Sequence, residues 1–201
     1  MTDIVYKACG EYIVELKRLS DTITNEKRDG VVDRNYAKFR GNKFFVHSIK
    51  HKITNDHLSE IENTVFSDKI IKYIVGEEIS TEFCENLNKI CAEGIHFFRS
   101  FDAAYYYLNN IRNGIYKEYA DNGQLVTKCN YKDNELNGEY NGFHENGKKS
   151  IICNYKDGEL DGEYSECHKN GQLIVHCKYK NDLLDGEYSK WYDDGKTIKK
   201  M

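Results

Sequence analysis

Asn113-Gly-Ile-Tyr-Lys-Glu-Tyr-Ala-Asp-Asn-Gly is the first copy of a motif that recurs through the last part of the sequence. Further copies of the motif begin at Asn137, Asp161 and Asp185. Each has Gly-x-Tyr near its start and Asn-Gly or Asp-Gly at its end. The four starting positions are spaced by 24 residues, without insertion. A fixed period of this length marks an array whose units bury their apolar faces against their neighbours. We therefore predict four repeats: residues 113–136, 137–160, 161–184 and a partial 185–201.

Each repeat has the pattern of a β-hairpin. A short strand opens at Gly-x-Tyr, Asn122-Gly123 or its equivalent makes the turn, and a strand with alternating polarity returns. Asn-Gly tolerates the positive φ values that a two-residue hairpin turn requires. Period-2 alternation predicts one shared face for every second residue of the return strands, from Leu125 to Tyr131, from Lys149 to Tyr155 and from Leu173 to Tyr179. The whole array is expected to be an antiparallel meander with one hairpin per repeat.

Equivalent residues of successive repeats form ladders in such a sheet. The tyrosines that recur in every copy, Tyr116 and its equivalents, are expected to pack, because stacked aromatic rings bury a large area on a pleated surface. Positions that vary between copies suit a specific recognition surface instead. The residues predicted to bind a protein partner are therefore Tyr119, Phe143, His144, His168, Trp191 and Tyr192.

The repeated motif resembles the MORN repeat, in its 24-residue antitoxin-type variant, by its pattern Gly-Glu-Tyr…Asn-Gly…Tyr-Lys-x-Gly-x-Leu. The resemblance implies a sheet of β-hairpins that serves as a scaffold, a dimerisation module or sometimes a membrane-lipid binder, and it implies no catalytic residue. We expect a mainly β fold. A compact β-rich (α+β) domain at residues 1–112 is followed by an elongated antiparallel hairpin sheet of MORN type at residues 113–201. The first domain is also expected to cap the array, because an open array exposes a bare edge.

Residues 1–112 carry no such period. Apolar runs predict strands near residues 4–6, 12–16, 70–75 and 90–99. Gly41-Asn42 predicts the turn of a further hairpin, between residues 35–40 and 43–49. Ser100 is expected to cap a helix over residues 101–109, where apolar residues recur at helical spacing.

The stretch from Tyr73-Ile-Val-Gly to Gly94-Ile-His-Phe-Phe resembles a domain of unknown function in proteins of giant DNA viruses of amoebae, where it precedes pentapeptide or MORN-type repeats. The sequence lacks proline and is rich in Lys, Asn, Ile and Tyr, as an A/T-rich genome tends to encode. Together these features predict a viral protein of mimivirus-like origin. The resemblance brings no known activity with it.

Composition points to a cytoplasmic protein. The sequence is 39% apolar and 31% charged, as in ordinary soluble proteins. It has neither an apolar run of about 20 residues, the length that crosses a bilayer, nor the layout of a secretion signal at its start. Its seven cysteines include Cys129, Cys153 and Cys177, which occupy the same position in the return strands of the three complete repeats. These would lie two strand spacings, about 9.5 Å, apart, which is too far for a disulfide or a shared zinc ion.

No catalytic motif, cofactor-binding loop or standard metal pattern is present, so we expect a protein that is not an enzyme and needs no cofactor. One alternative is a nucleophilic pair of Cys91 and His96 in the N-terminal domain. Cys84, Cys91 and His96 offer three metal ligands, but their spacing matches no zinc pattern. A histidine within an apolar run is more often a core residue with one ring nitrogen hydrogen-bonded.

Charge limits the partners. Basic residues gather in one stretch, which predicts a weak anion-binding cluster of Lys38, Arg40, Lys43, Lys50 and Lys52. The net charge of −4 disfavours nucleic acid. The repeats hold 13 lysines and 16 acidic residues, so phosphoinositide membranes are an alternative that the charge disfavours. The preferred function is a protein-binding adaptor or scaffold, with homodimerisation through the C-terminal repeat edge as one form of assembly.

Overall fold

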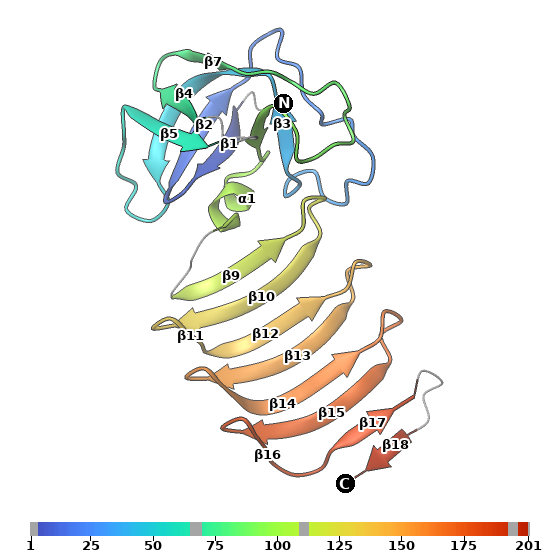
Figure 1. Ribbon diagram of the computed structural model, residues 1–201. Coiled ribbons are helices and arrows are strands. Elements are labelled where there is room, and N and C mark those ends of the chain that lie inside the picture. The colour runs from blue at the N-terminus through green and yellow to red at the C-terminus, as the bar shows by residue number, and fades with distance from the viewer. Residues whose placement is uncertain (1–3, 65–69, 109–112, 193–196, 201) are drawn as a thin grey trace. The chain divides into compact units, whose positions relative to one another are not determined.

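The computed structural model describes residues 4–64, 70–108, 113–192 and 197–200 (Figure 1). The chain forms two compact units. The first contains residues 1–109 together with 119–124, and the second contains residues 110–118 and 125–201. The domain boundary predicted at residue 112 lies outside the described residues. The mainly β fold is confirmed: a β-rich N-terminal unit with a short helix precedes a large antiparallel sheet.

The described part of the N-terminal unit contains small antiparallel sheets. Its elements are β1 (Ile4–Cys9), β2 (Tyr12–Lys17), β3 (Phe39–Gly41), β4 (Lys43–His51), β5 (Glu60–Thr64), β6 (Ile70–Ile74), β7 (Glu78–Ser80), β8 (Ile95–Phe97) and α1 (Phe101–Tyr106). One sheet has the order β1-β2-β4-β7, while β3 pairs with β8 and β5 with β6. The strands predicted near residues 4–6, 12–16 and 70–75 are thus confirmed as β1, β2 and β6.

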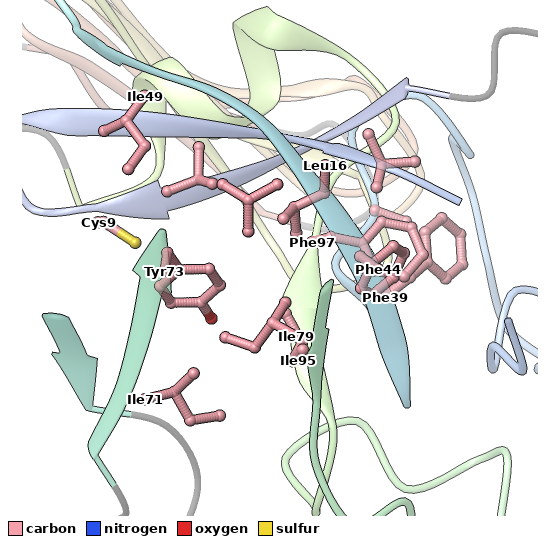
Figure 2. Packing of buried hydrophobic residues seen from close by; sticks show 14 residues of the cluster. Cys9, Leu16, Phe39, Phe44, Ile49, Ile71, Tyr73, Ile79, Ile95 and Phe97 are labelled. Atoms are coloured by element: carbon pink, nitrogen blue, oxygen red, sulfur yellow. The ribbon is translucent and has the colours of Figure 1, made fainter. Parts of the chain in front are cut away.

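The core of this unit lies between these sheets. Figure 2 shows the rings of Phe39, Phe44 and Phe97 gathered at one end of the cluster, with Tyr73 and Cys9 farther along it. Phe44 and Phe97 meet edge to face, with ring centroids 5.3 Å apart. Side chains from all three small sheets meet here, so burial of apolar surface joins these sheets into one unit.

The hairpin predicted around Gly41-Asn42 is wrong. β3 pairs with β8, more than 50 residues later, while β4 pairs with β2 and β7. All three residues of β3 are buried, so this strand needs apolar cover on both faces, which a surface hairpin would not provide. At the bend, Gly41 is packed so closely that an added Cβ would lie 2.6 Å from the ring of Phe44.

The strand predicted at residues 90–99 is also shorter than expected, because β8 spans only Ile95–Phe97. The preceding segment is a loop that folds around the side chain of Arg40, which is 0% exposed. Its guanidinium lies over the ring of Phe83, at 4.6 Å from the centroid. It also donates hydrogen bonds of 2.6–3.0 Å to the carbonyl oxygens of Cys84, Asn86, Lys89 and Glu93. These bonds draw the loop carbonyls inward and away from any strand pairing.

Helix α1 begins where the sequence predicts. The Ser100 hydroxyl accepts a hydrogen bond from the backbone N–H of Ala103, which confirms the N-cap. The helix ends at Tyr106, earlier than the predicted residue 109, which itself lies outside the described residues. Ala103 and Ala104 face the interior beside Phe98 and Ile13.

The described residues of the second unit form a ten-stranded antiparallel sheet. Its strands are β9 (Gly114–Tyr119), β10 (Leu125–Lys132), β11 (Glu135–Leu136), β12 (Gly138–Phe143), β13 (Lys149–Lys156), β14 (Glu159–Cys167), β15 (Leu173–Lys180), β16 (Leu183–Leu184), β17 (Ser189–Trp191) and β18 (Thr197–Lys200). Each long strand pairs with the one before and after it in the chain, as Figure 1 shows from β9 to β18. The predicted hairpin meander is confirmed.

The turns differ from the prediction in their type. At Asn146-Gly147 only the glycine has a positive φ, and the Gly147 N–H donates to the His144 carbonyl. A three-residue loop thus ends in a left-handed glycine, the second common hairpin geometry. The two-residue turns with positive φ at both positions lie at the other connection, at Asp133-Asn134, Asp157-Gly158 and Asn181-Asp182.

A bulge recurs near the end of the hairpins. The register shifts by one residue between Gly142 and Phe143 in β12–β13, and at the equivalent place in β14–β15 and β17–β18. A one-residue shift moves the following side chain to the other face of the sheet. The prediction that Lys149 and Leu173 share a face with the cysteines of their strands is therefore wrong.

The turn of the first hairpin belongs to the N-terminal unit. The Asn122 carbonyl accepts hydrogen bonds from the N–H groups of Val32 and Asp33, and the Asp121 carbonyl accepts one from Lys38. Arg28 also donates to the Asp121 carbonyl, at 2.6 Å. We call residues 28–38 the turn cradle. Sequence reasoning missed it, because a polar loop without a period gives no sign of what it binds.

Candidate binding face of the repeat sheet

The two faces of the repeat sheet differ in chemistry. Cross-strand partners lie on the same face, and Tyr140 pairs with Cys153 as Tyr164 pairs with Cys177. The tyrosine face is defined by Tyr116, Thr127, Cys129, Tyr131, Tyr140, Ile151, Cys153, Tyr155, Tyr164, Val175, Cys177 and Tyr179. The intervening residues form the charged face. The tyrosine face is thus an almost uncharged strip across successive strands.

Tyrosine pairs repeat along this face. Tyr116 and Tyr131, Tyr140 and Tyr155, and Tyr164 and Tyr179 meet edge to face, with ring centroids 6.1, 5.9 and 5.6 Å apart. In two of these hairpins the second tyrosine pairs across strands with a glycine, Gly138 or Gly162. The missing side chain leaves room for a ring to lie over the backbone. All six tyrosines stay half-buried, so their outer surfaces remain open to contact.

The cysteines lie beneath the tyrosines. Cys129, Cys153 and Cys177 are buried, with Cys153 only 1% exposed. Burial raises the pKa of Cys129 and of Cys153 to about 11. These thiols are neutral at physiological pH, which suits packing and disfavours a role as nucleophiles.

Comparison with known families matches both units of the chain. Residues 2–104 match DUF5758, described as a family of unknown function. The chain belongs to the DUF5758 family. Residues 112–133, 136–157 and 160–181 match the MORN repeat variant. No curated protein and no solved structure matches. The predicted fourth repeat, residues 185–201, is not among the matched stretches, although β17 and β18 form a hairpin there.

The MORN repeats indicate a role in binding a membrane or a protein. Within the described residues, no helix has the length and apolar character needed to span a bilayer. The face opposite the tyrosines is polar: Lys149 pairs with Glu139 at 3.7 Å, and the His176 ring lies 3.4 Å from a Glu163 carboxylate oxygen. Most charged side chains of the MORN sheet therefore lie on the face opposite the tyrosines, while Glu118, Glu166 and Lys190 share the tyrosine side.

The residues predicted to bind a partner lie in different settings. Tyr119 belongs to the N-terminal unit, called the DUF5758 unit below, and stacks on Tyr36, with ring centroids 4.2 Å apart. His144 donates from Nε2 to the Cys167 carbonyl at 2.7 Å, which links one MORN repeat to the next. Tyr192 is 56% exposed. The remaining three, Phe143, His168 and Trp191, are half-buried at the same ends of their hairpins.

The structure does not gather the predicted anion-binding residues on one surface. Arg40 is enclosed by its loop, and Lys38 and Lys52 are each 8% exposed. The Lys38 ammonium lies 3.2 Å from the Tyr107 hydroxyl. The other two are paired, Lys43 with Asp21 and Lys50 with Glu15. Anion binding by these residues stays a prediction, but the DUF5758 fold already uses most of their charges internally.

Cys91 and His96 have separate contacts. The Cys91 sulfur lies 3.8 Å from the Lys38 ammonium. The His96 Nε2 lies 2.9 Å from the Ile90 carbonyl, which can only accept, so Nε2 carries the proton. Burial lowers the pKa of His96 to about 4. Among the described residues, no group of three or more His, Cys, Asp or Glu side chains is arranged to hold a metal ion.

Proposed function

We propose that this chain is a non-enzymatic adaptor whose MORN sheet binds a protein partner through its tyrosine face. The observation that carries the proposal is an aromatic face with few charged residues, opposite a face that carries most of the charges, in a sheet that is a single layer. A sheet with one apolar face buries that face against another element. Within the described part of the second unit, no helix or second sheet covers it. Large exposed apolar patches are typical of interaction sites.

Charge favours a protein over a membrane as the partner. The repeats contain 13 lysines, no arginine and 16 acidic residues. Each basic residue near an anionic membrane surface contributes about 1 kcal/mol to binding, so surfaces that bind such lipids carry basic clusters. By sheet register, the charged residues on the tyrosine side include two acidic residues, Glu118 and Glu166, and one lysine, Lys190, so this side carries no basic cluster for anionic lipid. Half-buried tyrosine rings instead resemble the anchors of protein interfaces.

Neighbouring residues of β13 provide the test. Ile151 lies on the tyrosine face and Ile152 on the charged face, and both are half-buried. A photo-reactive benzoylphenylalanine at position 151 should crosslink to a discrete protein in cells, whereas the same group at position 152 should not. Equal crosslinking from both positions would contradict the proposal.

A second pair of variants separates protein from lipid. Tyr164→Lys places a charge on the tyrosine face, and Ser165→Lys is the matched change on the other face. We expect Tyr164→Lys to remove the crosslink made from position 151, and Ser165→Lys to retain it. Vesicles containing a phosphatidylinositol phosphate should bind neither the unmodified protein nor its variants. Vesicle binding that Tyr164→Lys abolishes would favour the membrane alternative.

We also propose that one assembly partner is a second copy of the chain. In the described sheet β18 has β17 as its neighbour, so its other edge offers backbone groups for strand pairing. Light scattering should then give twice the monomer mass, and deletion of residues 197–201 should restore the monomer. From the resemblance to giant-virus proteins we further propose that this adaptor acts in the cytoplasm of an infected host cell or in the virion. Affinity capture from infected cells would identify its partner.

A further inference from the structure

The tyrosines of the MORN sheet recur at a fixed spacing across its strands. Cys153 in β13 pairs with Tyr140 in β12 on one side and with Tyr164 in β14 on the other. Tyr164 pairs in turn with Cys177 in β15. Tyrosine and cysteine therefore alternate along a row that runs perpendicular to the strands. Equivalent tyrosines are two strand spacings, about 9.5 Å, apart along this row.

The rings are the parts of this row that a ligand meets first. Cys153 and Cys177 are each 1% exposed, whereas the tyrosines between them are half-buried. Each tyrosine of the row also meets a second ring from the next strand, as Tyr140 meets Tyr155 with centroids 5.9 Å apart. The tyrosine face thus presents one ring pair per complete repeat, with a period of about 9.5 Å.

Among the regular backbone conformations, the polyproline II helix matches this period. It has three residues per turn and a rise of about 3.1 Å, so every third residue faces the same side at about 9.3 Å. Residues on one face of a β-strand recur at about 6.8 Å, and residues seven apart in an α-helix at about 10.5 Å. Over three ring pairs the mismatch is about 0.4 Å for polyproline II and about 2 Å for an α-helix.

The charge of the face adds a further condition on its ligand. Between β9 and β15, the charged residues that share the tyrosine side in the described sheet are acidic, Glu118 and Glu166. The Glu166 carboxylate accepts a hydrogen bond from the Tyr164 hydroxyl at 2.5 Å, so it lies beside a ring pair. A neutral or basic segment therefore fits this face better than an acidic one.

We propose that the tyrosine face binds a proline-rich segment of its partner protein, in the polyproline II conformation and running across the strands. This inference rests on the proposed function, because it names the class of partner segment for the same face. Proline-rich segments of this conformation dock on surfaces lined by aromatic rings. Their carbonyl groups make no internal hydrogen bonds, so they accept from tyrosine hydroxyls. These 201 residues contain no proline, so a second copy of them cannot supply the segment.

The test uses the full chain and a neutral ten-residue probe. The peptide (Pro-Ala-Ala)3-Pro, acetylated and amidated at its ends, is titrated into the isotope-labelled protein, and backbone amide shifts are followed by nuclear magnetic resonance. We expect saturable shifts concentrated around Tyr140, Cys153 and Tyr164. The same ten residues with proline at every second position should bind at least about threefold more weakly, because fewer prolines meet a ring pair. Equal affinity of the two peptides, or no binding of either, would overturn the proposal.

Neighbouring residues of β14 supply matched variants. Tyr164→Leu keeps an apolar side chain on the tyrosine face but removes a ring, and should weaken binding of the period-three peptide by at least about threefold. Ser165→Leu is the matched change on the charged face and should leave the affinity unchanged. Equal effects of the two changes, in proteins whose amide spectra show a folded sheet, would contradict the proposed contact.

Crosslinking from position 151 distinguishes a failure of this inference from a failure of the proposed function. A crosslink to a discrete protein, with no binding of the period-three peptide, would overturn the polyproline II assignment and leave the adaptor in place. Absence of both would overturn both. The expected result is a crosslink that an excess of the period-three peptide reduces and that the isomeric peptide reduces less.

Discussion

Two buried polar side chains in the DUF5758 unit differ in whether they have hydrogen-bond partners. Arg40 is fully buried, yet four carbonyl oxygens and the Phe83 ring surround its guanidinium. Tyr73 is also fully buried, but its hydroxyl has no hydrogen-bond partner within the described structure. Figure 2 shows this hydroxyl directed into the apolar cluster. Arg40 therefore organises its surroundings, whereas the Tyr73 hydroxyl opposes folding.

Tyr73→Phe is expected to stabilise the protein. The change removes a buried hydroxyl without a partner and keeps the ring, so the free energy of unfolding should rise by about 1 kcal/mol. Urea unfolding followed by circular dichroism measures the change. Arg40→Met is the contrasting variant, because it leaves four carbonyls without their donor and should destabilise the protein strongly. A loss of stability in Tyr73→Phe would show that the hydroxyl has a partner.

The buried thiols predict sensitivity to alkali. The pKa of Cys129 and of Cys153 is raised from an ordinary 9 to about 11 in the folded chain. The folded state therefore holds these protons more tightly than the unfolded state does. Stability is complete below about pH 9 and falls as the pH rises towards 11, because the unfolded thiols ionise first.

The measurement is the urea midpoint at pH 8 and at pH 10.5. We expect a lower midpoint at the higher pH, and a smaller difference in the double variant Cys129→Ala with Cys153→Ala, which lacks both titrating groups. Tyrosines of raised pKa contribute to the fall in both proteins, so the variant isolates the thiols. An identical fall in the two proteins would assign the effect to other residues.

Among the elements, local pattern predicted the repeat sheet better than the N-terminal unit. The 24-residue spacing gave the correct order of hairpins, because each strand pairs with its neighbour in the chain. The turn types were exchanged, since Asn-Gly suits both two-residue and three-residue loops and cross-strand register selects between them. The pairing of β3 with β8 joins segments that are distant in sequence, and no local signal reports it. Burial of Arg40 was missed for the same reason.

The same limits apply to the candidate site. The alternation of polar and apolar residues correctly placed the tyrosines and the cysteines of the return strands on one face. It failed only beyond the recurring bulge, where the register shifts by one residue. Variation between copies selected Tyr119 as a surface residue, but its partner Tyr36 lies far away in the sequence and occupies its ring. At Gly186, Lys178 replaces the asparagine that lies over the equivalent glycine of the two preceding repeats. This change is visible in the sequence, but its effect on packing depends on strand register.

At the first hairpin, Gly123→Ala should destabilise the N-terminal unit. A Cβ there would lie 2.2 Å from the Asp33 carbonyl oxygen, at a φ of +87°. Gly171→Ala is the matched control, because its φ is +93° but a Cβ would meet only the flexible end of Lys148, at 3.8 Å. Both changes strain the backbone by about 1–2 kcal/mol, so any further loss at Gly123 measures the clash with the turn cradle. Equal losses in thermal unfolding would show that the cradle tolerates the methyl group.

For the whole molecule, the compact units do not coincide with consecutive stretches of chain. The N-terminal unit includes residues 119–124, which come from the first MORN repeat. Within this unit, Arg28 and the N–H groups of Val32, Asp33 and Lys38 donate to the turn. The family match ends at residue 104, so the DUF5758 family profile alone does not mark the full extent of the folded unit.

A fragment of residues 1–112 should be less stable than a fragment of residues 1–134, which contains the complete first hairpin. The shorter fragment loses the carbonyl acceptors of four donors, and each such hydrogen bond contributes about 0.5–1.5 kcal/mol. Thermal unfolding of the two fragments, monitored by near-ultraviolet circular dichroism, tests this. Equal midpoints would mean that the turn adds nothing to the unit that holds it.

The unvarying register of the central hairpins makes the length of this protein adjustable. Residues 137–160 contain neither the turn held by the turn cradle nor the last hairpin, β17–β18, and the chain enters and leaves them at equivalent backbone positions. Excising or duplicating that segment would subtract or add one tyrosine pair while both ends keep their neighbours. Gain or loss of whole units would therefore change the extent of the tyrosine face in steps of one hairpin, without a change at either end.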